Sequence, residues 1–144
     1  MLETNSLIRI NEHLVALLDR RDSIRENELC RLLRSTAEVN KLEIIEPIGQ
    51  KNVKLAVAVA VRVELTSNQQ KILLGQVLAR GRSNEIKQYV MRLFCCRFGV
   101  RRFFRGLEEY SDIYPKSVKL AAYYACSSKS FSKNRKEIFR RFLN

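Results

Sequence analysis

The sequence predicts an α+β fold that is predominantly helical, with one β-hairpin between an N-terminal helical pair and a basic, helical C-terminal part. Apolar residues recur at helical spacing before residue 42 and after residue 65, and they alternate at period two from Val53 to Leu65. The positive charge lies almost wholly after residue 65. A content of 46% hydrophobic and 29% charged residues in 144 is typical of a globular protein.

The N-terminal part predicts two amphipathic helices. The first has Asn5 or Ser6 as its cap and ends near Arg21. The second begins at Ser23, which has Glu26 at the spacing of a capping box. The apolar stripe of the first helix consists of Leu7, Ile10, Leu14, Leu17 and Leu18. Each helix therefore has one face to bury.

Residues 42–65 predict the β-hairpin. Leu42-Glu43-Ile44-Ile45-Glu46 predicts a strand, and the turn signal Pro47-Ile48-Gly49-Gln50 follows it. Valine or leucine then occupies every second position from Val53 to Leu65, and alanines or charged residues stand between them. This alternation predicts a strand, since a helix with the same residues would be apolar on all sides.

After residue 65 the pattern becomes helical and stays helical. Thr66 or Ser67 caps a helix that Gly81 ends, and Ser83 caps a second helix that Gly99 ends. The pair has the order helix, tight turn, helix. Three further helices are predicted, with these bounds: Val100 to about Tyr110 with a break at Gly106, Pro115 to about Cys126, and a last one after Ser130 or Ser132.

The charge divides the chain into two parts at Leu65. Residues 1–65 hold ten basic and ten acidic residues, whereas residues 66–144 hold 17 basic and five acidic ones. The whole net charge of +12 therefore lies in the second part, which predicts a polyanionic partner such as nucleic acid. We expect residues 66–144 to bind nucleic acid, and residues 1–65 to form a homodimer or to contact a protein co-regulator.

Two segments of the basic part hold the candidate nucleic-acid-binding residues. In MRLFCCRFGVRRFFRG (residues 91–106), arginines recur every four residues and would form a stripe on a helix. Arginine suits phosphate groups and guanine edges alike, and the more C-terminal cations are expected on phosphates. The candidates are Arg97, Arg101, Arg102 and Arg105 in the first segment and Lys129, Lys133, Arg135 and Lys136 in the second.

Four phenylalanines stand among these arginines: Phe94, Phe98, Phe103 and Phe104. Exposed aromatic rings could stack on unpaired bases, as they do in proteins that bind single strands. Phenylalanine more often fills a hydrophobic core, and we expect a core role here.

Two stretches of the basic part resemble AraC-type transcription activators, most closely those that control type III secretion genes. KILLGQVLA (71–79), RFGV (97–100) and FRGL (104–107) resemble the first helix-turn-helix of that family with its F/Y-G-V-S turn, although Arg101 replaces the serine. LAAYYACSSKSFSK (120–133) resembles the second motif, L-A-x-x-x-G-F-S-S-x-S-x-F-S-R, and is one residue short. The resemblance covers about half the chain and implies duplex DNA binding in transcription regulation.

A second pattern is similar to the opening of the LuxR-type helix-turn-helix. It consists of Leu65-Thr66 and the run ARGRSNEI at 79–86, with two extra residues between the halves. Both resemblances imply a short helix that crosses the DNA backbone and a following helix that lies in the major groove.

The sequence predicts no enzyme, no cofactor and no metal site. The single histidine, His13, lies beside Glu12 on a predicted amphipathic helix, and there is no glycine-rich phosphate loop, nucleophile elbow or His-Glu-x-x-His. The four cysteines form no Cys-x-x-Cys pair. With no leader at Met1, and with Val53 to Val61 too short to span a bilayer, a cytoplasmic protein without a membrane partner is expected.

Two alternatives to DNA binding stay open. The first is a small helical subunit of a ribonucleoprotein that binds RNA or single strands. The second is an interaction protein whose basic part docks an acidic partner while its neutral part dimerises.

Overall fold

The computed structural model describes residues 2–36, 39–129 and 132–143. Of these residues 84% are helical and none lies in a β-strand, so the protein is all-α. The predicted α+β class is wrong, because the segment predicted as a β-hairpin, residues 42–65, folds as two helices. The chain divides into two compact units, unit 1 (Met1–Leu65) and unit 2 (Thr66–Asn144).

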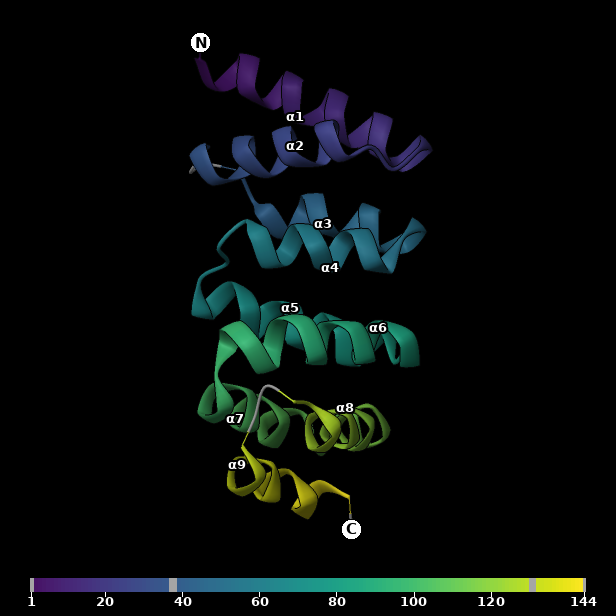
Figure 1. The fold of residues 1–144 in the computed structure, drawn as a ribbon, viewed down its shortest axis with the longest axis vertical. Helices are drawn as coiled ribbons and strands as arrows, with labels where there is room; N and C mark the ends of the chain where they lie inside the picture. Colours follow the sequence, from purple (N-terminus) through teal and green to yellow (C-terminus); the bar gives the residue numbers. More distant parts are fainter. Residues whose placement is uncertain (1, 37–38, 130–131, 144) are drawn as a thin grey trace. The chain divides into compact units, whose positions relative to one another are not determined.

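Unit 1 consists of two helical hairpins. In each hairpin the two helices lie side by side, as Figure 1 shows. Helix α1 also packs on α3 and α2 on α4, so the hairpins stack with like helices in contact, as in α-solenoid proteins. The described helices of unit 1 are α1 (Leu2–Asp19), α2 (Ser23–Ser35), α3 (Lys41–Lys51) and α4 (Val53–Arg62).

Helix α4 replaces the predicted long strand. Six consecutive residues, Leu55 to Ala60, are buried, so the helix is apolar on all sides and is packed on all sides. Alanine, which fills the positions between the valines, is the best helix former. The Asn52 side chain caps the helix by accepting a hydrogen bond of 3.1 Å from the backbone N–H of Leu55. A fully buried helix needs no polar face, and for this reason the period-two pattern misled the prediction.

Helix α3 contains the residues predicted as strand and turn. The Asn40 side chain accepts a hydrogen bond of 3.1 Å from the backbone N–H of Leu42 and so caps the helix. Pro47 lies within α3, and the helix ends only where the Asn52 N–H donates to the Ile48 carbonyl at 2.7 Å. The predicted turn at Pro47 to Gln50 is therefore wrong, and Asn52 alone separates α3 from α4.

The starts of α1 and α2 differ from the predicted caps. Helix α1 extends back to Leu2, so Asn5 and Ser6 lie inside it. Helix α2 is capped by Asp22 instead of Ser23, because the Asp22 carboxylate accepts hydrogen bonds from the N–H groups of residues 24 and 25 at 2.8 and 3.3 Å. The predicted apolar stripe of α1 is buried at Ile10, Leu14 and Leu17.

Unit 2 also stacks one helical hairpin on another. Helix α5 packs on α7, and the continuous segment formed by α6 and η1 packs on α8. Its described helices are α5 (Ser67–Arg80), α6 (Ser83–Tyr89), the π-helix η1 (Val90–Phe98), α7 (Val100–Tyr110), α8 (Pro115–Ser127), α9 (Lys133–Glu137) and the 3₁₀-helix η2 (Ile138–Phe142). Helix η2 packs on α8.

Several helix ends of unit 2 follow the sequence signals. Thr66 and Gln69 form a reciprocal capping box, with hydrogen bonds of 3.1 and 2.8 Å. Gly81 ends α5 in the left-handed conformation with φ of 64°, Pro115 is the first residue of α8, and Ser132 caps α9. The other predicted cap for the last helix, at position 130, lies outside the described residues.

Two predictions about unit 2 are wrong. Ser83 is the first residue of α6 and does not cap it by a side-chain hydrogen bond. Gly106 does not interrupt α7, because it lies buried within the helix. A Cβ atom at this position would come within 2.5 Å of Leu74 Cδ2, so the glycine permits the close approach of α5 and α7.

Candidate nucleic-acid interface

The candidate site begins at the junction between η1 and α7. Gly99 is the single non-helical residue between them, with φ of 93° and ψ of 153°, a conformation that glycine adopts far more readily than other residues. A Cβ there would meet no atom within 4 Å, so the backbone conformation and not crowding requires the glycine. Helix α7 then begins with no side-chain cap, and Arg101 and Arg102 lie exposed in its first turn.

The phenylalanines beneath these arginines form an aromatic core. Phe94, Phe98 and Phe103 are buried, and the Phe94 ring lies 6.2 Å from that of Phe98 and 5.7 Å from that of Phe103. The Phe103 ring lies 5.4 Å from that of Phe139 in η2, so the cluster joins η1, α7 and η2. The prediction of a core role is confirmed for the three buried rings.

Phe104 is half-buried and its ring is already in contact with other side chains. The ring lies 5.3 Å from that of Phe142, and the Arg141 guanidinium lies over it at 5.0 Å from the centroid. The ring therefore packs at the surface of the core, where a cation–π contact covers it.

Two hollows flank the start of α7. The larger, of about 700 Å³, brings Arg101 and Arg102 of α7 together with Asn134 and Arg135 of α9. Its apolar lining consists of Phe98, Gly99, Val100 and Ile138. The structure thus joins the two segments in which the candidate residues were predicted.

The smaller hollow, of about 390 Å³, lies between α5 and α7. Arg102, Arg105 and Glu109 of α7 line it together with Ser67, Asn68 and Lys71 from the first turns of α5. Arg102 lines both hollows, so the arginines of α7 stand between them. We call Arg101, Arg102 and Arg105 of α7 with Arg135 of α9 the α7 arginine surface.

The remaining predicted residues line neither of these hollows. Arg97, Lys129 and Lys133 are exposed, and Lys136 is half-buried. Lys71 and Asn68 were missed by the sequence analysis. They precede α7 by about thirty residues, and only the packing of α5 on α7 brings them to the hollow.

No acidic residue of unit 2 forms an ion pair with the α7 arginine surface among the described residues, and Glu109, which lines the smaller hollow, is paired with Lys71. Four of the five acidic side chains of unit 2 already form ion pairs, at 2.9 to 3.4 Å, with cations other than the eight predicted ones. These pairs are Glu85 with Arg80, Glu108 with Arg141, Glu109 with Lys71 and Glu137 with Arg140. Within the part of the chain that the structure describes, none of the eight predicted cations forms an ion pair.

Comparisons with known proteins do not identify a family. No family model, curated protein or solved structure matches this chain. The resemblance to AraC-type activators stays a prediction, and one non-helical residue separates η1 from α7, whereas a helix-turn-helix has a turn of three or four. The ligand of the α7 arginine surface must therefore be inferred from the chemistry of the surface itself.

The described residues give little support for a membrane-spanning segment, a metal site or a nucleophilic cysteine. They contain no helix long and apolar enough to cross a membrane, and no cluster of three or more histidine, cysteine or acidic side chains that could hold a metal ion. Cys95, in η1, is buried, and burial raises the pKa of its thiol to about 12. This thiol therefore stays protonated at neutral pH and is a poor nucleophile.

Proposed function

We propose that unit 2 binds duplex DNA through phosphate contacts made by the α7 arginine surface. The observation that carries the proposal is the gathering, around two adjoining hollows, of four arginines that have no ion-pair partner among the described residues. Guanidinium groups donate paired hydrogen bonds to phosphate oxygens, and cations that lack carboxylate partners are free to make them. The role in transcription regulation that the AraC resemblance implies is part of this proposal.

The aromatic residues favour a duplex over a single strand as the ligand of this surface. Proteins that bind single strands combine a basic groove with exposed aromatic rings on which bases stack. Here Phe98 and Phe103 are buried, and Phe104 is covered by Arg141. DNA is favoured over RNA by the resemblance to AraC-type activators, because phosphate contacts alone do not distinguish the two duplexes.

The test is the salt dependence of binding to a short fluorescent DNA duplex, measured by anisotropy. The variant R101A/R102A/R105A should bind at least about tenfold more weakly, and the slope of log K against log salt should fall by about 0.9 for each phosphate that the protein no longer neutralises. The matched control is R25A/R34A/K54A, which removes three exposed cations from unit 1. An equal weakening in both variants, or an unchanged affinity of the first, would contradict the proposal.

The alternatives are separated in the same assay. If double-stranded RNA or a single strand binds more tightly than duplex DNA, and R101A/R102A/R105A loses that binding, that ligand replaces duplex DNA at the α7 arginine surface. If no nucleic acid binds at low salt, an acidic protein becomes the expected partner of the surface.

A further inference from the structure

A second basic surface in unit 2 lies on α8. This helix buries Val118, Ala121, Ala122 and Ala125. The residues at the opposite side of the helical wheel are exposed and follow one another at intervals of three or four, which places them in one row along the helix. We call this row, formed by Lys116, Lys119, Tyr123 and Ser127, the α8 face.

Tyr123 is held in an exposed position on this face. Its side chain is 56% exposed, and its ring lies edge-on to Tyr124 with 5.5 Å between the centroids. The Tyr124 hydroxyl in turn lies 3.4 Å from the Ser83 hydroxyl at the start of α6. The Tyr123 ring therefore packs on a neighbour that itself contacts α6.

The charge of the α8 face is positive and uncompensated. Lys116 and Lys119 form no ion pair with the residues that the structure describes, and α8 contains no acidic residue. Helix α6 packs on α8, and its one acidic residue, Glu85, is buried and paired with Arg80. The face therefore combines cations with an exposed aromatic ring, and the α7 arginine surface lacks such a ring.

We propose that the α8 face is a second nucleic-acid contact, one that takes unpaired nucleotides. The Tyr123 ring stacks on a base, and the two lysines contact the phosphates beside it. An acidic peptide would engage the lysines and leave the ring unused, so an unpaired strand fits the whole face better. This contact is separate from the α7 arginine surface, so each of the two proposals can fail alone.

The test compares the binding of labelled oligothymidine by the full chain and its variants. Y123A should weaken binding about 5- to 150-fold, the effect of removing one base–aromatic stack, whereas Y123F should bind as the wild type does. K116A/K119A should lower the salt slope. The matched control is I113A, which removes another apolar side chain that is 62% exposed but lies outside α8. Since Tyr123 is exposed, circular dichroism should show that Y123A is folded.

The outcomes separate this inference from the proposed function. Loss of oligothymidine binding in Y123A, with duplex binding unchanged, supports the α8 face. An unchanged affinity of Y123A for oligothymidine, or an equal weakening in I113A, overturns the α8-face proposal. The proposal also fails if R101A/R102A/R105A loses oligothymidine binding and Y123A does not. If duplex DNA does not bind but oligothymidine still depends on Tyr123, only the duplex proposal fails.

Discussion

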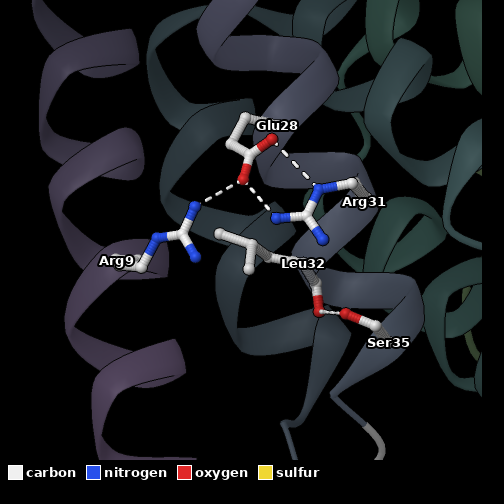
Figure 2. Close-up of polar contacts among 5 residues, drawn as sticks. All are labelled: Arg9, Glu28, Arg31, Leu32 and Ser35. Carbon is white, nitrogen blue, oxygen red and sulfur yellow. Dashed lines mark hydrogen bonds and ion pairs between the residues drawn. The ribbon is translucent and has the colours of Figure 1, made fainter.

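Each unit stacks one helical hairpin on another, and in the described residues each holds four cations in ion pairs; the units differ in how many cations are left without a carboxylate. In unit 1, the Glu28 carboxylate accepts hydrogen bonds from Arg9 of α1, at 2.7 Å, and from Arg31 of its own helix, as Figure 2 shows. Glu26 likewise pairs with Arg21 at 3.2 Å and lies 3.8 Å from Arg62. In unit 2, the arginines of the α7 arginine surface have no such carboxylate among the described residues.

This difference indicates that stacked helical hairpins are a scaffold, and that the arrangement of charge on them decides what each unit can bind. One arrangement of an ion pair occurs in both units. An arginine near the end of the first helix pairs with a buried glutamate five residues later, Arg21 with Glu26 and Arg80 with Glu85. Each of these two pairs lies at the turn between two helices, whereas the arginines of the α7 arginine surface contribute charge to the exterior.

Removing the buried carboxylates should affect the units unequally, and this is the largest effect we expect. The Glu85 side chain is 2% exposed and its partner Arg80 26%, so E85Q should lower the free energy of unfolding by about 3 kcal/mol. Arg21 and Arg62 are 47% and 36% exposed, and water can solvate them, so E26Q should cost only about 1 kcal/mol. Urea denaturation followed by circular dichroism measures both. Equal costs would show that the two pairs are equivalent.

The close approach of α5 and α7 provides a second, smaller effect. In G106A, the new Cβ would lie 2.5 Å from Leu74 Cδ2, and Leu74 is fully buried and has no room to move. We expect a loss of about 1–2 kcal/mol in urea denaturation, the usual cost of overpacking. Because α7 must shift, duplex DNA binding should weaken a few-fold, while E26Q, in unit 1, leaves it unchanged. Unchanged DNA binding by G106A would show that the position of α7 is not critical.

The sequence predicted several features that depend on neighbouring residues. The cap at Thr66 or Ser67, the helix end at Gly81 and the helix start at Pro115 were predictable because each depends on residues within one turn. The caps at Ser23 and Ser83 are equally local and were wrong, because a polar residue near a helix start does not by itself show which residue is the cap. Helix α4 was not, since burial on every side is decided by α2 and α3 and leaves no polar face to mark a helical period.

The same distinction holds for the candidate site. The arginine-rich segment was visible in the sequence, and so was the core role of Phe94 and Phe103. Packing between helices that are far apart in the sequence brings Arg101 and Arg135 to one hollow, and Lys71 and Arg105 to the other.

The smallest expected effect is a shift in the pKa of Glu28. It tests whether the Glu28 carboxylate forms ion pairs with Arg9 and Arg31. The hydrogen bond from Arg31, followed by the positive charges of Arg31 and Arg9, lowers the pKa of Glu28 below its ordinary value of 4.5. Because the folded-state pKa is the lower one, the stabilising contribution is complete above pH 4.5 and is lost as the pH falls through the folded-state pKa. At neutral pH the pairing in unit 1 should therefore be complete.

An NMR titration of the Glu28 carboxyl carbon measures this pKa directly. The midpoint should lie below 4.5 in the wild type, rise most in R31A and less in R9A, and stay unchanged in the control R25A, because Arg25 does not contact Glu28. A wild-type midpoint at or above 4.5 would mean that Arg9 and Arg31 are no better neutralised than the arginines of α7. The contrast between the two units would then rest on the number of acidic residues alone, and Arg9 and Arg31 would be as available to a phosphate as Arg101 and Arg102.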